Sequence, residues 1–254
     1  MTYSSVFVTQ SAPSLIVPDY CEIFRYMGYS LHDRIAASAK FSSDAENAGK
    51  IDGIEEPENV ANAEIAGDAD RSSCNSEIHQ MVAQVTADFQ KLMTPQAVYA
   101  LFPLEITGDF LRFGRERIKS RELSRSLKEC HSVLLFAATI GPKIDREIQK
   151  MQRIESSRAV IMQAVGAMFI EKYCDLLCTE LKNQAIAENM AVKNRFSPGF
   201  SDVGLEVQKI FFSLLDCKKI GLTLMESLIM APEKSVTAFV GVKATEVGEV
   251  ENLI

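Results

Sequence analysis

The chain has 254 residues, 47% of them hydrophobic, which is enough to bury one substantial core. No apolar run approaches the roughly 18 residues of a membrane span, and the N-terminus lacks the basic cluster and apolar stretch of a signal peptide, so we expect a cytoplasmic protein with no membrane partner. The formal net charge of −7 argues against nucleic acid as a partner, because phosphates need a basic surface.

The acidic excess is concentrated in residues 42–76. This segment contains nine acidic and two basic residues, which accounts for the whole net charge. It has no aromatic residue and cannot bury enough apolar area to offset the entropy of ordering. We therefore predict one domain in three parts, with residues 1–41 as an N-terminal helical segment, 42–76 as a disordered acidic insertion and 77–254 as the remainder. Docking of a basic partner on the insertion is the alternative.

Two amphipathic segments flank this insertion. Residues 20–37 place apolar side chains at helical spacing, with Gly28 interrupting the stripe, and residues 76–92 repeat the pattern. A third segment of this kind covers residues 120–130. We predict a helix for each of the three.

Short strands are predicted at residues 101–106 and 110–113, on either side of a Thr-Gly-Asp turn. Residues 132–139 form a largely apolar run, which is typical of a buried strand. The run leads through Ile-Gly to Pro142, which is tolerated in the first turn of a helix because its missing N–H would have no partner there. We predict that this helix covers residues 142–154.

A longer helix is predicted over residues 156–187, followed by a turn at residues 195–202. Ser201 or Asp202 could cap a helix that ends at Leu215, since short polar side chains accept hydrogen bonds from the N–H groups of a first helical turn.

Strand-like patterns follow at residues 222–230 and 235–242, and the second alternates with the period of a sheet. Because helices and strands do not alternate regularly along the chain, the expected fold class is α+β, with mixed helices around a largely antiparallel sheet.

Several familiar kinds of site are missing from the sequence. The six cysteines and three histidines show no spacing suited to a metal, so we expect buried, reduced thiols and no bound metal. Neither a dinucleotide-binding nor a P-loop glycine pattern is present. The Asp-x-His-x-x-Gly signature of corrinoid-binding modules is also absent, so a partner would have to supply any corrinoid.

The most unusual polar stretch begins at Arg195, whose rigid guanidinium suits a carboxylate. Ser197 opens a Ser-Pro-Gly turn in which Gly199 has no side chain to keep a flat ligand away from the backbone. Phe200 then offers an aromatic face. The alternative is a structural turn in which Arg195 caps the preceding helix.

Glu171 and Asp175 stand one helical turn apart, on a face of small residues in the predicted long helix. Two carboxylates are costly to bury unless a cation meets them. They either pair with Lys172 or Arg195 on a partly solvated face or meet a ligand that carries both a cation and a carboxylate, such as an amino acid or a sulfonium nucleoside.

Several short motifs share their order and spacing with a known family. They are residues 23–29 (Ile-Phe-Arg-Tyr-Met-Gly-Tyr), 138–142 (Ala-Thr-Ile-Gly-Pro), Glu171, 195–202 (Arg-Phe-Ser-Pro-Gly-Phe-Ser-Asp), 220–223 (Ile-Gly-Leu-Thr) and 232–237 (Pro-Glu-Lys-Ser-Val-Thr). On these motifs the chain resembles the S-adenosylmethionine-binding reactivation domain of cobalamin-dependent methionine synthase, and in particular the stand-alone short proteins with that domain.

The resemblance implies that Arg195, Ser197, Gly199, Phe200 and Glu171 bind S-adenosylmethionine. It also implies partners: a methionine synthase or related corrinoid methyltransferase that carries the cobalamin, and a flavodoxin- or ferredoxin-like electron donor. The inactive cob(II)alamin would receive an electron from that donor and a methyl group from S-adenosylmethionine. Phe200 replaces the tyrosine usual in the family and so lacks its hydroxyl. The alternative is a non-catalytic interaction module of a corrinoid system that has lost its ligand.

Overall fold

The computed structural model of the chain describes residues 5–30, 34 and 69–245. Residues 42–68 of the predicted insertion lie outside the described residues, and helix α3 (Ala69–Leu92) begins within the last part of that segment. The chain forms two compact units. The first comprises Met1–Val17, Leu92–Glu147 and Phe169–Ile254, and the second comprises Pro18–Lys91 and Ile148–Met168.

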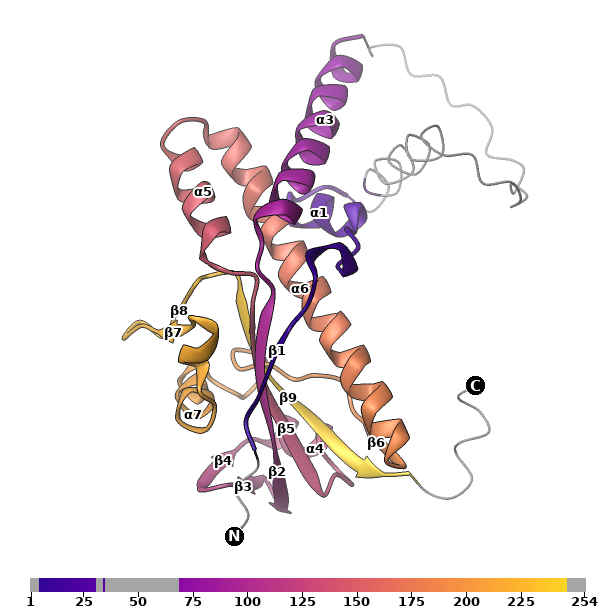
Figure 1. Cartoon of the computed structure of the whole chain (residues 1–254), viewed down its shortest axis with the longest axis vertical. Coiled ribbons are helices and arrows are strands. Elements are labelled where there is room, and N and C mark those ends of the chain that lie inside the picture. Colours follow the sequence, from indigo (N-terminus) through magenta and orange to yellow (C-terminus); the bar gives the residue numbers. More distant parts are fainter. Residues whose placement is uncertain (1–4, 31–33, 35–68, 246–254) are drawn as a thin grey trace, which may run out of the picture. The chain divides into compact units, whose positions relative to one another are not determined.

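An antiparallel sheet is the framework of the first unit (Figure 1). Its strands are β1 (Phe7–Gln10), β2 (Gln96–Thr107), β3 (Phe110–Phe113), β4 (Glu116–Lys119), β5 (Ser132–Thr139), β6 (Met190–Val192) and β9 (Ser235–Ala244). The order across the sheet is β4-β3-β2-β5-β9-β6, and β1 and β3 pair with the first and last parts of β2 respectively. The predicted α+β class with a largely antiparallel sheet is confirmed.

The helices agree with the sequence pattern where that pattern is long. They are α1 (Tyr20–Tyr26), α3, α4 (Arg121–Ser126), α5 (Pro142–Gln152), α6 (Ser156–Ala187) and α7 (Gln208–Leu214), with 3-10 turns η1 (Pro13–Leu15), η2 (Leu205–Val207) and η3 (Cys217–Ile220). The bounds predicted for α6 are confirmed, whereas α4 and α5 end before their predicted last residues. Long as α6 is, neither it nor any other helix of the described residues has the apolar stretch needed to cross a bilayer.

Strand β5 confirms the prediction at residues 132–139 and lies between β2 and β9. Every residue of β5 after Ser132 is buried, which explains why its sequence is apolar throughout instead of alternating. The strands predicted at residues 110–113 and 235–242 are confirmed as β3 and most of β9, and residues 101–106 lie within β2. Among the described strands of three or four residues, β3 was predicted because the Thr-Gly-Asp turn precedes it, whereas β1, β4 and β6 were not predicted.

The strand predicted at residues 222–230 is wrong. Only its ends form strands, β7 (Thr223–Leu224) and β8 (Met230–Ala231), which pair with each other as a separate two-stranded sheet. Between them Leu228 has a φ of +64°, a left-handed conformation that a continuous strand does not contain.

The two faces of the main sheet are covered by different helices. Leu135 of β5 and Phe239 of β9 lie on one face, in a core that includes Phe211 of α7. On the opposite face, burial and the negative charge of Glu180 in α6 raise the pKa of Tyr99. Figure 1 shows α7 and the C-terminal part of α6 on opposite sides of the strands.

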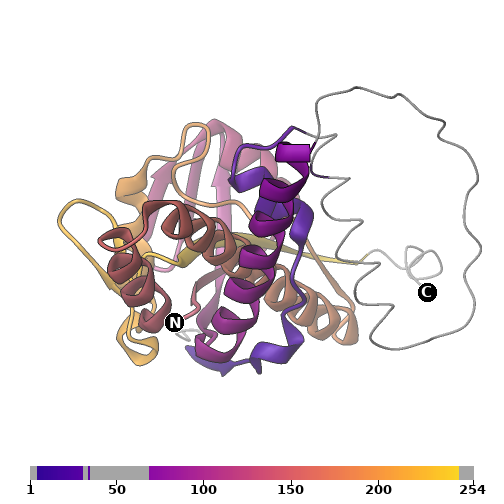
Figure 2. The ribbon, with the colours of Figure 1, turned by 90° about the horizontal axis from the view of Figure 1, so that it is seen from above.

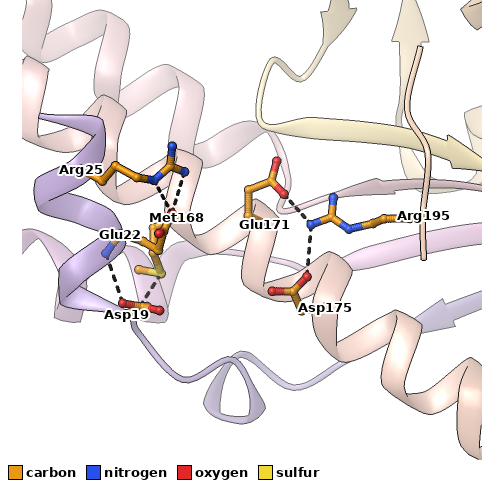
Figure 3. A network of polar contacts seen from close by, with 7 residues as sticks. All are labelled: Asp19, Glu22, Arg25, Met168, Glu171, Asp175 and Arg195. Atoms are coloured by element: carbon orange, nitrogen blue, oxygen red, sulfur yellow. Dashed lines mark hydrogen bonds and ion pairs between the residues drawn. The ribbon is translucent and has the colours of Figure 1, made fainter. Parts of the chain in front are cut away.

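The second unit contains α1, most of α3 and parts of α5 and α6. Asp19 caps α1 by accepting a hydrogen bond from the Glu22 N–H (3.1 Å), and the Asp19 N–H donates to the sulfur of Met168 (3.4 Å; Figure 3). The rings of Phe24 and His79 lie 5.1 Å apart, so α1 and α3 pack side by side (Figure 2).

Helix α1 is shorter than the helix predicted at residues 20–37. It ends at Tyr26, and Gly28 takes a φ of +86° that ends the helical path. Residues 31–33 and 35–37 of that prediction lie outside the described residues.

The prediction that Ser201 or Asp202 caps the next helix is also wrong. Ser201 has a φ of +54°, and α7 begins only at Gln208, after η2. The Asp202 carboxylate instead accepts hydrogen bonds from the Ser120 hydroxyl (2.5 Å) and the Arg121 N–H (2.7 Å), at the start of α4. It thereby satisfies N–H groups of a helix about 80 residues earlier, which the sequence pattern did not indicate.

Replacing Asp202 should weaken the connection between this loop and α4. The hydrogen bond from Ser120, followed by those from the Arg121 and Glu122 N–H groups, lowers the pKa of Asp202 despite the opposing effect of burial. A carboxylate with a lowered pKa stabilises the fold above its unfolded pKa, about 4, and loses that contribution as the pH falls through its folded pKa. Thermal unfolding of Asp202→Asn should therefore occur at a lower Tm than that of the unmutated protein at pH 7.

The difference in Tm between Asp202→Asn and the unmutated protein should narrow as the pH is lowered from 7 to 3, because the protonated aspartate resembles asparagine. A difference that stays constant over this range would contradict the role given to the Asp202 charge.

Candidate functional site

A pocket of about 600 Å³ opens in the first unit where the loop after β6 meets α6, α7, β8 and β9. It contains most of the residues on which the sequence-based site prediction rests. Its lining residues are Glu171, Arg195, Phe196, Ser197, Pro198, Phe200, Gln208, Met230, Ser235, Val236 and Thr237.

Arg195 is held by a continuation of the sheet beyond β6. The Lys193 N–H donates to the Gly241 carbonyl, and Phe196 and Phe239 exchange two backbone hydrogen bonds, each of 2.8 Å. Because side chains alternate along an extended segment, Phe196 packs against the core while Arg195 points away from it. The backbone on both sides of Arg195 is therefore fixed by β9.

The guanidinium of Arg195 meets two carboxylates of α6 (Figure 3). Its Nη2 lies 2.6 Å from Glu171 Oε2 and 3.1 Å from Asp175 Oδ1. Glu171 and Asp175 stand one helical turn apart, so both can contact the same nitrogen. The pairing of these carboxylates with Arg195, one of the two alternatives from the sequence, is present.

The charges of this cluster stabilise one another. Burial would lower the pKa of Arg195, but the hydrogen bond with Glu171 and the neighbouring negative charges outweigh it and raise the pKa. Burial also raises the pKa of Cys174, on the same helix, so that its thiol stays neutral beside the ion pairs. Arg195 Nη1 and Nε take part in no hydrogen bond or ion pair with any described residue, and can therefore donate to a further acceptor.

Gly199 shapes the loop, and it is not among the lining residues. Its φ is +92°, and its N–H donates to the Val203 carbonyl at 2.7 Å. A Cβ atom there would lie 2.9 Å from a methyl group of Leu205. Phe200, next to it, lines the pocket and is 68% exposed, so its ring lies at the rim.

The structure thus brings together Glu171, Arg195, Ser197 and Phe200, with Gly199 supporting their turn; their contact with a ligand stays a prediction. The sequence analysis did not single out the lining residues from α7 and β8, and it noted those from β9 only as part of the family motif at residues 232–237, without a ligand role. Gln208 had no distinguishing signal within a predicted helix.

No family model matches this chain, and no curated protein matches it. Among solved structures, a reactivation domain of the methionine synthase type has the same fold as this chain. The particular structure is described as "Crystal Structure of the MetH Reactivation Domain bound to AdoHcy", with a TM-score of 0.59 and 15% sequence identity. The similarity covers 93% of this chain and 78% of the other. The predicted fold is thereby confirmed.

Proposed function

We propose that this chain binds S-adenosylmethionine in the Arg195 pocket and supports reductive methylation of a corrinoid held by a separate methyltransferase. The observation that carries the proposal is the Arg195–Glu171 pair at the wall of this pocket. It lies in a fold shared with a domain whose structure holds AdoHcy, the demethylated counterpart of that methyl donor.

The residues of the pocket fit such a ligand. Its volume lies within the roughly 300–1,000 Å³ typical of small-molecule sites. The unused donors of Arg195 suit the carboxylate of an amino acid, while Glu171, with its side chain 40% exposed, suits a cationic group. Phe196, Pro198 and Val236 supply apolar walls for the rest of the molecule.

The sulfonium of S-adenosylmethionine supplies an electrophilic methyl group, so the contribution of this chain is to hold and orient the donor. The sequence lacks the corrinoid-binding signature, which favours a corrinoid carried by a partner. A flavodoxin- or ferredoxin-like protein would supply the electron that reductive methylation requires. The exposed Phe200 at the rim is compatible with a methyl group that must be passed to another protein.

Calorimetric titration of the purified chain with S-adenosylmethionine tests the first part of the proposal. We expect one site with a dissociation constant on the order of micromolar. Absence of binding at millimolar ligand would remove the proposed function. It would favour the alternative, an interaction module that has lost its ligand, which is also motivated by Phe200 at the position where the family usually has tyrosine.

The second part of the proposal needs a partner. An inactivated cobalamin-dependent methyltransferase that lacks its own reactivation domain should regain activity when this chain, S-adenosylmethionine and a reduced flavodoxin are all added. Recovery at the same rate without this chain would count against it.

A further inference from the structure

Gln208 is a buried polar residue in the pocket with an unused hydrogen-bond acceptor. It is the first residue of α7, its exposed fraction is 7%, and it lines the pocket. Its Oε1 is buried and has no hydrogen-bond partner among the residues that the structure describes. Burying a polar atom without a partner is unfavourable, so most such atoms in folded proteins are paired.

The position of Gln208 at the start of a helix does not explain its burial. The residue before it, Val207, is the N-cap of α7, and no side-chain hydrogen bond caps this end. An apolar residue at position 208 would fill the same space without leaving an acceptor unpaired. A ligand that donates a hydrogen bond in the pocket would supply the missing partner.

The lining of the pocket indicates which part of a ligand Gln208 would meet. Phe196, Pro198, Met230 and Val236 line the pocket with apolar surface, which suits a flat heteroaromatic ring better than a charged group. The charged groups of the same pocket, Arg195 and Glu171, are those that the proposed function assigns to the carboxylate and the cationic group of the ligand, which leaves its base for Gln208. A carboxamide is the natural complement of the N6/N7 edge of adenine, because it accepts from the exocyclic amine and donates to N7.

We infer that Gln208 is a specificity-determining residue of this pocket, whose amide recognises the amino-substituted edge of an adenine base. The inference rests on the proposed function and adds the group that selects the base. It also implies that Gln208 is retained at the expense of stability in the unliganded protein, since its acceptor is paired only when ligand is bound.

The test compares Gln208→Met with the unmutated protein in titrations against S-adenosylhomocysteine and S-inosylhomocysteine, which carries a 6-oxo group in place of the amine. The unmutated protein should bind the adenine ligand at least tenfold more tightly than the inosine ligand. Gln208→Met should lose about tenfold in affinity for the adenine ligand and bind both ligands alike. Gln184→Met, at an exposed position of α6, is the matched control and should behave as the unmutated protein.

A second readout uses no ligand. Gln208→Met should raise the Tm of the unliganded protein by about 2–4 °C, whereas Gln184→Met should not. A lower Tm for Gln208→Met would show that the amide is paired within the protein, and would overturn the inference. An unchanged preference for adenine in Gln208→Met, with both proteins still binding ligand, would also overturn the inference. This outcome would leave the proposed function intact. Failure of the unmutated protein to bind either ligand would instead remove the proposed function together with this inference.

Discussion

Arg195→Ala should reduce the affinity of the chain for S-adenosylmethionine by about 10- to 150-fold, measured by calorimetric titration. The change removes the donors that we assign to the ligand carboxylate, and hydrogen bonds to charged groups contribute about 1.5–3 kcal/mol. It also leaves Glu171 and Asp175 without the cation that they share. Arg195→Lys keeps the charge but not the planar fork, so an intermediate loss is expected.

The matched control for Arg195 is Arg125→Ala. Arg125 also pairs with a glutamate, Glu122 at 3.2 Å, but its side chain is 67% exposed and does not line the pocket. It should leave the affinity unchanged. All titrations should be made at a temperature at which each variant is folded, so that lost stability is not mistaken for lost affinity. An Arg195→Ala variant that binds within twofold of the unmutated protein would exclude Arg195 from the site.

Gly141→Ala should destabilise the protein by about 3 kcal/mol, measured by denaturant unfolding. Gly141 joins β5 to α5 with a φ of +92°, a conformation that side chains rarely adopt. An added Cβ atom would collide with the Thr94 hydroxyl. The backbone of Thr94 is held in place, because its N–H donates to the Ile140 carbonyl at 2.8 Å, so the contact could be relieved there only by rotation of the Thr94 side chain.

Gly108→Ala separates backbone strain from collision. Gly108 has a φ of +61°, but a Cβ atom there would meet no atom of the described part of the chain within 4 Å. Only the strain should remain, at about 1–2 kcal/mol. Equal losses for the two variants would mean that the contact with Thr94 is relieved by rotation of its side chain.

The parts of the fold that could be predicted are those in which one element carries its own signal. The apolar run of β5 and the long periodic pattern of α6 identify these elements without reference to the rest of the chain. Strands β1 and β6 could not be predicted, because each is short and lies at an edge of the sheet, where its pairing depends on β2 or β9.

The residues of the candidate site also divide into those that could be identified from their own chemistry and those whose role depends on the folded structure. Arg195 and Glu171 were identified from residue chemistry and from the family resemblance, and the structure places them in contact. Gln208 could not be identified, because its importance depends on where the start of α7 lies relative to the pocket. Asp202 was assigned to the wrong helix for a related reason: a capping carboxylate can serve any helix start that tertiary structure brings to it, and here that start is α4.

The link between Asp202 and α4 also has a consequence for local unfolding. Asp202, in the loop that follows Arg195, supplies the acceptor for the Arg121 and Glu122 N–H groups in the first turn of α4, so these two hydrogen bonds are lost once that loop moves away. We therefore expect opening of the loop to weaken the start of α4, although about 80 residues separate them in the chain. A ligand that holds this loop in place would also stabilise the start of α4. Its binding would therefore reduce local unfolding of residues that lie outside the pocket.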